Sequence, residues 1–140
     1  MDENRLRAEK AVLARHLPAN MYRFEKVGNT LWFKAAARTN RGNVYTLAFL
    51  LADFPLEVPK VFVTQMLKNK KGEPLDSVDG HMHVLTSVHG WTRICHYGSD
   101  SWTPMVSLFK IYVKCRLWLE MYELHLQTGK SIDYYLNHQH

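Results

Sequence analysis

The chain has 140 residues, of which 46% are hydrophobic and 22% are charged. That length suits one domain with a real hydrophobic core, and so large an apolar share excludes an intrinsically disordered chain. No apolar run approaches the ~20 residues that a membrane-spanning helix requires, and the N-terminus lacks the apolar stretch of a secretory signal. We therefore expect one folded domain over residues 1–140, located in the cytoplasm.

The formal net charge of +5 and the isoelectric point of about 9.3 describe a moderately basic protein. Such proteins often bind nucleic acid, membrane surfaces or acidic proteins. The basic residues are spread along the chain, whereas nucleic-acid binding is indicated by clustered charge. We therefore expect an acidic protein partner, and neither nucleic acid nor a membrane.

The first element expected in chain order is a helix over residues 3–17. Leu6, Leu13 and Leu17 fall within one helical stripe, which is typical of a helix that packs on a core. Pro18 follows as a stop signal, because proline has no N–H with which to continue the helix.

Strand-like segments come next, at residues 21–27, 31–37, 45–51 and 61–63. The second and third alternate apolar and polar residues on either side of the turn signal at residues 40–43, so they predict a β-hairpin. The third and fourth are separated by Phe54-Pro55 and Val58-Pro59, where the chain leaves the sheet because proline donates no ladder hydrogen bond.

A long stretch over residues 65–101 has no regular pattern, and such a stretch inside a compact domain is usually functional. Thr103 then predicts an N-cap and Pro104 a first helical position, with a largely buried helix running to about Gln127. Gly129 is expected to end this helix, and a short helix from Ser131 closes the chain. The order of elements predicts an α+β fold with helices packed on one face of an antiparallel sheet.

The two cysteines lie in contrasting contexts. A structural disulfide between them is not expected in the cytosol, where thiols are kept reduced. Cys95 is flanked by the polar residues His96, Ser99 and Asp100, whereas Cys115 lies inside an apolar helical run. We interpret Cys115 as a buried core residue and Cys95 as the reactive thiol.

Three local motifs resemble those of the ubiquitin-conjugating enzyme family. Residues 54–61 read Phe-Pro-Leu-Glu-Val-Pro-Lys-Val, similar to the family's turn into its fourth strand. Arg93-Ile94-Cys95 is similar to the segment that carries the active thiol, and Trp102-Thr103-Pro104 to the start of the central helix. The resemblance implies the ubiquitin-conjugating fold: an N-terminal helix, a four-stranded antiparallel meander, and a long central helix after the active-site loop.

The resemblance also implies the activity and its partners. An activating enzyme would transfer a ubiquitin-like protein to Cys95 as a thioester, and an amine of a target protein would resolve that thioester. No cofactor or metal is expected. In the family the first helix docks the activating enzyme, which assigns Arg5, Arg7 and Lys10 to that contact here.

One departure from the family concerns the residues ahead of the cysteine. The family has His-Pro-Asn there, with a glycine seven residues after the histidine. His83 and Gly90 keep that separation, so Leu85 stands in place of the asparagine that steadies the transition state. This departure resembles bacterial relatives encoded beside their own activating enzyme and modifier, some of them linked to phage defence. His89 is the nearest polar residue that could take over the oxyanion-stabilising role.

Conjugation also requires a group that desolvates or deprotonates the incoming amine. Asp100 is the acid nearest to Cys95 in the sequence, and the resemblance places Asp133 where the family has an acidic residue that faces the active site. Helix capping or solvent exposure would also explain either acid. By the same resemblance His83 holds the loop together through hydrogen bonds, and we expect His96 to be a solvated neighbour.

Other classes of site remain open at this point. A metal site could use His81, His83, His89, Cys95 and His96, although no tight ligand pair is present and a metal would block the thiol. A cysteine hydrolase could combine Cys95 with His83 or His89 and with Asp100. A non-catalytic module that only binds ubiquitin-like proteins would explain Leu85.

Overall fold

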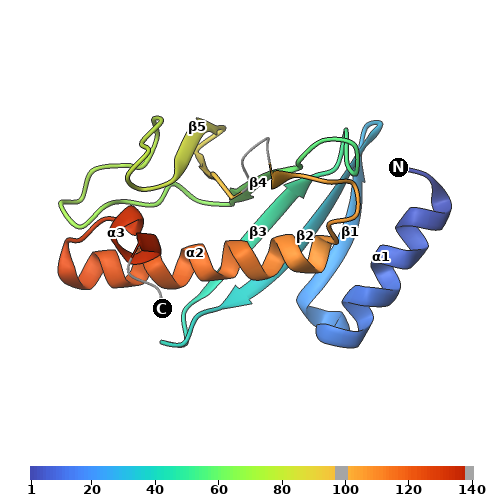
Figure 1. Ribbon diagram of the computed structural model, residues 1–140, viewed down its shortest axis with the longest axis horizontal. Helices are drawn as coiled ribbons and strands as arrows, with labels where there is room; N and C mark the ends of the chain where they lie inside the picture. Colours follow the sequence, from blue (N-terminus) through green and yellow to red (C-terminus); the bar gives the residue numbers. More distant parts are fainter. Residues whose placement is uncertain (97–100, 138–140) are drawn as a thin grey trace.

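A computed structural model describes residues 1–96 and 101–137 of the chain. Its elements comprise an N-terminal helix, an antiparallel sheet and two later helices (Figure 1). This is the mixed α+β arrangement that the sequence predicts. No helix in these two ranges is long and apolar enough to cross a membrane.

Helix α1 (Glu3–His16) agrees with the helix predicted at residues 3–17. Its N-cap is Asp2, whose side chain accepts a hydrogen bond from the Arg5 N–H at 2.7 Å. Leu13 and Glu9 are the buried residues of the helix. A single helical turn, η1 (Ala19–Met21), follows Pro18 and leads into the sheet.

The four predicted strands form a meander in the expected order, listed here with their bounds: β1 (Tyr22–Val27), β2 (Thr30–Arg38), β3 (Val44–Leu50) and β4 (Lys60–Val63). Alternation sets the face that each residue occupies, because successive strand side chains point to opposite sides. Phe33 and Ala35 of β2 therefore point into the core, and Phe33 pairs with the buried Phe49 of β3. Helix α2 covers this face (Figure 1).

The segment predicted to be irregular contains a second hairpin, so that prediction was wrong in part. Strands β5 (Val84–Val88) and β6 (Trp91–Ile94) extend the sheet to six strands in the order β1-β2-β3-β4-β6-β5. Both strands are short and a register shift interrupts their pairing, which explains the weak sequence pattern. Gly90 lies at the turn with a positive φ of 76°.

Helix α2 (Leu108–Thr128) begins later than predicted. Its N-cap is Ser107, whose Oγ accepts from the Lys110 N–H, and Thr103 and Pro104 lie ahead of the helix. The reason lies in Arg5, whose guanidinium donates to the carbonyl oxygens of Pro104 and Val106 at 2.5 and 3.0 Å. These hydrogen bonds attach the segment before Ser107 to α1 in a non-helical conformation.

The N-terminus of α2 is also bound by a carboxylate from α1. Glu9, only 4% exposed, accepts from the Leu108 N–H at 2.6 Å and from Arg5 at 3.0 Å. A carboxylate at this position satisfies an otherwise unpaired N–H and opposes the positive end of the helix dipole. The other end of α2 stops at Gly129 with φ 78°, as predicted, and α3 (Ile132–Asn137) follows.

Candidate functional site

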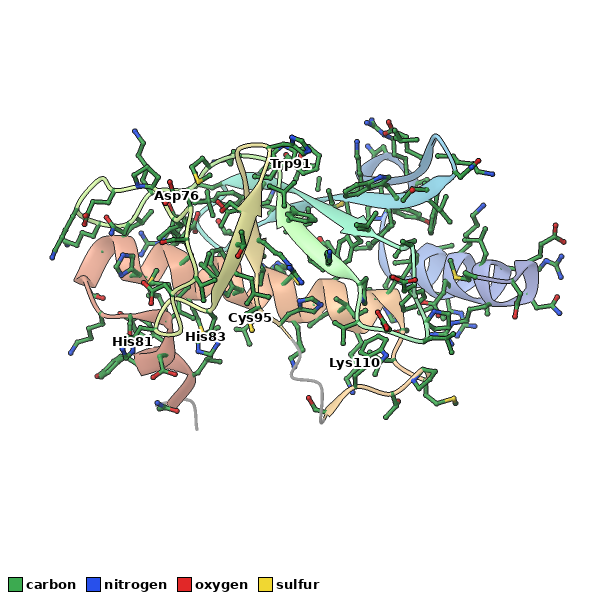
Figure 2. All side chains as sticks on the ribbon, turned by 90° about the horizontal axis from the view of Figure 1, so that it is seen from above. Asp76, His81, His83, Trp91, Cys95 and Lys110 are labelled. Carbon is green, nitrogen blue, oxygen red and sulfur yellow. The ribbon has the colours of Figure 1, made fainter. Side chains whose placement is uncertain are left out.

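Cys95 directly follows β6 and is half-buried. Its backbone N–H donates to the His83 carbonyl at 2.9 Å, next to the ladder pair formed by Val84 and Ile94. The β5–β6 hairpin therefore brings His83 to Cys95, although twelve positions separate them in the sequence. Figure 2 shows His83 and Cys95 near α2 on one side of the molecule, with Trp91 on the other.

The thiol lies at a cavity of about 350 Å³ between the end of the hairpin and the C-terminal helices. Most of its wall is apolar and comes from α2 and α3. The cavity is lined by His83, Cys95, His96, Lys114, Leu117, Trp118, Met121 and Leu136. Trp118 is fixed because its indole N–H donates to the Met82 carbonyl at 3.0 Å. A chain that enters this cavity can approach the sulfur while apolar side chains limit the access of water.

The side chains of His83 and Asp133 contact each other next to the segment that holds Cys95. His83 Nε2 lies 3.2 Å from Asp133 Oδ1, and the Asp133 N–H donates to the His81 carbonyl at 2.8 Å. These two bonds hold α3 against the segment that precedes β5. His83 has a positive φ of 52°, a conformation that non-glycine residues adopt mainly where surrounding contacts enforce it. Of the predicted site residues, the structure thus links Cys95 to His83 through the backbone, and Asp133 to His83 through the side chains.

His89 does not lie near the thiol. It is exposed at the β5–β6 turn, with φ 53°, whereas Cys95 is at the far end of β6. At ~3.3 Å per strand residue, the four steps from Trp91 to Cys95 put about 13 Å between the turn and the thiol residue. The expectation that His89 replaces the missing asparagine is therefore not supported by the geometry. Leu85, at the asparagine position, is not among the residues that line the cavity. Asp100 lies outside the described residues.

His96 is partly buried in the cavity wall, which corrects the expectation of a solvated side chain. Its Nδ1 lies 3.3 Å from the Ile94 carbonyl oxygen. Burial lowers the pKa of His96 to about 4, so the ring is neutral at physiological pH. A neutral ring next to Cys95 adds no charge to the site.

Lys114 was not singled out in the sequence, yet it lines the cavity together with Cys95. Burial lowers the pKa of Lys114, because an apolar environment disfavours the charged ammonium form. The residue escaped notice because it interrupts an apolar run that reads as core. Its position one helical turn before Trp118 was the available signal, since residues four apart share a helix face.

Cys115 is fully buried in the core, as expected. Burial raises the pKa of its thiol, which keeps it protonated and unreactive.

The three basic residues assigned to partner docking differ in their surroundings. Arg5 is bound to Glu9 and to the segment before α2, and its guanidinium lies 5.0 Å from the centre of the Phe54 ring. The guanidinium of Arg5 therefore joins α1 to the rest of the fold. Arg7 and Lys10 are exposed on α1, with the Lys10 ammonium 5.2 Å from the Phe24 ring centre.

The histidines do not assemble a metal centre in the described part of the chain. No group of three His, Cys, Asp or Glu residues there could hold a metal ion. Comparisons with protein-family models, with curated proteins and with solved structures each found no match to this chain. The chemistry of the site therefore follows from its own residues: a half-buried thiol, a histidine and a lysine line one apolar cavity, and an aspartate contacts the histidine.

Proposed function

We propose that this chain has the ubiquitin-conjugating fold and carries a ubiquitin-like protein as a thioester on Cys95. The observation that carries the proposal is the position of the thiol. Cys95 is half-buried at an apolar cavity, fixed by its backbone to His83, and it directly follows the sheet that α2 covers. The four-stranded meander between α1 and the hairpin supports the same reading.

The reaction has two steps at the sulfur. The Cys95 thiolate attacks the carbonyl carbon of the modifier's C-terminus, which an activating enzyme presents as its own thioester, and the activating enzyme's thiol leaves. A target amine then attacks the new thioester, an amide forms, and Cys95 is released. Both steps need a reduced thiol. We therefore propose that the protein acts in a reducing compartment, the cytoplasm. We further propose that the protein belongs to the bacterial type of ubiquitin-like conjugation system and acts in defence against phage.

The charging assay tests this proposal. The protein is incubated with ATP, an activating enzyme and a ubiquitin-like protein encoded beside it, and intact masses are measured with and without added thiol. We expect an adduct of modifier mass that thiol removes, that Cys95→Ala abolishes, and that Cys115→Ala retains. Cys95→Lys should give a thiol-resistant adduct, because an amide replaces the thioester.

The absence of an adduct, with an activating enzyme that demonstrably charges itself, would overturn the carrier function. A module that only binds the modifier would then be the leading interpretation, in keeping with Leu85. Binding of the modifier to the Cys95→Ala protein, measured by calorimetry, would then test that interpretation directly.

A second candidate function follows from the contact between His83 and Asp133. Cys95 and His83 line one cavity, and Asp133 contacts His83, so the three residue types of a thiol hydrolase are present. The two functions predict different fates for a loaded cysteine. A carrier holds its thioester until an amine arrives, whereas a hydrolase releases the free acid in water at once and cleaves amide substrates without ATP.

Docking of the activating enzyme is proposed at the exposed face of α1. Arg7→Glu with Lys10→Glu should slow charging several-fold at low salt and less at 0.5 M salt, because such charges act mainly on the association rate. The control is Arg41→Glu with Lys71→Glu, exposed residues of two loops, which should leave the rate unchanged. Equal charging rates for both variants would count against the α1 surface.

A further inference from the structure

We propose that Lys114 is an internal acceptor: in the absence of a target amine, the acyl group carried on Cys95 transfers to the Nζ atom of Lys114. This inference rests on the proposed carrier function and adds a modification site to it. The self-modified chain would keep the acyl group as a stable amide and would free Cys95.

The first observation is that the two groups share one cavity. Cys95 lies at the end of β6 and Lys114 on α2, and both line the same space of about 350 Å³. Lys114 is held by α2, and Cys95 is held by the hydrogen bond of its N–H to the His83 carbonyl, directly after β6. An acyl group on the sulfur occupies this shared space. A reaction within one molecule then replaces an encounter between two, which gives the lysine a large advantage over dissolved amines.

The second observation concerns the wall around the lysine. Leu117, Trp118 and Met121 line the cavity on the same helix, and Leu136 lines it from α3. An apolar wall favours the neutral amine over the ammonium ion. In agreement, burial lowers the pKa of Lys114, with the positive charge of Lys110 contributing in the same direction. The neutral amine is the form that attacks a thioester.

The step balances without any further reactant. The lone pair of Lys114 Nζ attacks the thioester carbonyl carbon, and a C–N bond forms as the C–S bond breaks. Cys95 leaves as a thiolate, and the proton lost by the nitrogen passes to the sulfur or to water. The thioester and the amine thereby become an amide and a free thiol, with no oxidation or reduction.

Lys110 provides a matched control on the same helix. It lies one turn before Lys114, and both lysines are exposed, but Lys110 does not line the cavity. Figure 2 shows it on α2 at a distance from Cys95, toward the start of the helix. If any exposed lysine of this helix could accept the acyl group, both Lys110 and Lys114 would be modified.

The experiment loads Cys95 chemically, so that its result does not depend on an activating enzyme. A synthetic peptide ending in two glycines, as its mercaptoethanesulfonate thioester, is exchanged onto the full-length protein. Excess peptide is removed, and intact mass spectrometry with and without thiol follows the loaded molecules in amine-free buffer. The quantity measured is the rate, per loaded molecule, at which a thiol-sensitive adduct becomes thiol-resistant.

We expect the thiol-resistant adduct in the wild-type protein, localised to Lys114 by peptide mapping. Lys114→Arg should slow its formation at least tenfold, because arginine keeps the positive charge but is not a comparable nucleophile. Lys110→Arg should stay within twofold of the wild type, and Cys95→Ala should give no adduct.

Three outcomes would overturn the inference: an adduct on another lysine, wild-type conversion in Lys114→Arg, or loss of the wild-type thioester by hydrolysis alone. None of these concerns enzymatic charging. Failure of the proposed carrier function would instead appear as absent loading from the charged activating enzyme, while the peptide experiment can still be completed. The two failures are therefore distinguishable.

Discussion

Cys95 and Cys115 carry the same thiol in two contrasting regions of the protein. Cys115 belongs to the core region, in which α2 packs on the sheet, and it has no solvent exposure. Cys95 belongs to the site region, defined as residues 81–96 with α3, and it opens onto a cavity. Lys114 precedes Cys115 on α2 and lines the cavity onto which Cys95 opens. Placement, and not residue type, thus separates a structural thiol from a chemical one.

The two regions also differ in how they are held. The core region is joined to α1 through Glu9. This carboxylate is buried and accepts a hydrogen bond from the Leu108 N–H. The site region is held to α3 by the contact between His83 and Asp133, whose side chains are 29% and 42% exposed. Exposed ion pairs contribute much less to stability than buried hydrogen bonds to charged groups. We therefore expect the site region to open more readily than the core region.

The largest expected effect is on thiol reactivity. Iodoacetamide should alkylate native Cys95 at least ~100-fold faster than Cys115, because a buried thiol reacts only after an opening that costs about 3 kcal/mol or more. Peptide mapping by mass spectrometry after timed labelling measures both rates in one sample. Comparable rates would show that the core region opens as readily as the site region, and the proposed difference between the two regions would be wrong.

The core region was the more predictable of the two. The helix at residues 3–17, the four-strand meander and the stop at Gly129 depend on local patterns, and the structure has all three. The start of α2 at Leu108 was missed, because the contacts of Arg5 with Pro104 and Val106 join residues about a hundred positions apart. No local pattern encodes such a contact.

The site region was predicted less completely. The resemblance to the ubiquitin-conjugating family drew attention to His83, and to Cys95 and Asp133, each of which bonds to His83. His89 was chosen for its polarity and its nearness in the sequence, but the hairpin carries it away from the thiol. Lys114 and His96 gain their positions from the packing of α2 against the hairpin, which residue spacing alone does not encode.

The second prediction tests the joint between α1 and α2. Glu9→Ala should lower the free energy of unfolding by about 3 kcal/mol, because it leaves the buried Leu108 N–H and Arg5 without their carboxylate. Urea denaturation followed by circular dichroism measures this change. The control is Glu3→Gln, an exposed acid of the same helix, with an expected loss below about 1 kcal/mol. Equal losses of unfolding free energy in the two variants would mean that the buried contacts of Glu9 add no stability beyond that of an exposed acid.

The third prediction concerns pH and the site region. The pKa of His96 is about 4 in the folded protein, against an ordinary value of 6.5. The unfolded chain therefore binds a proton between these values while the folded protein does not. Stability is fully present above pH 6.5 and falls as the pH is lowered toward 4, by at most about 3 kcal/mol.

The measurement for His96 is a series of urea denaturations from pH 7 to pH 4, compared with His96→Gln. Other groups contribute to both curves, so the difference between them reports His96. We expect that difference to shrink or change sign as the pH falls. Parallel curves would show that His96 is solvated in the folded protein, which would also remove it from the cavity wall.

The smallest expected effect is the coupling between His83 and Asp133. A double-mutant cycle with His83→Asn, Asp133→Asn and the double variant should give about 0.5 kcal/mol, because solvent screens this exposed pair. Asparagine suits position 83, since it tolerates the positive φ there. The same variants should change the alkylation rate of Cys95 by no more than a few-fold. A coupling above ~2 kcal/mol would mean that α3 is bound to the site region as firmly as α1 is to the core region, and the difference between the two regions would then lie in exposure of the thiols alone.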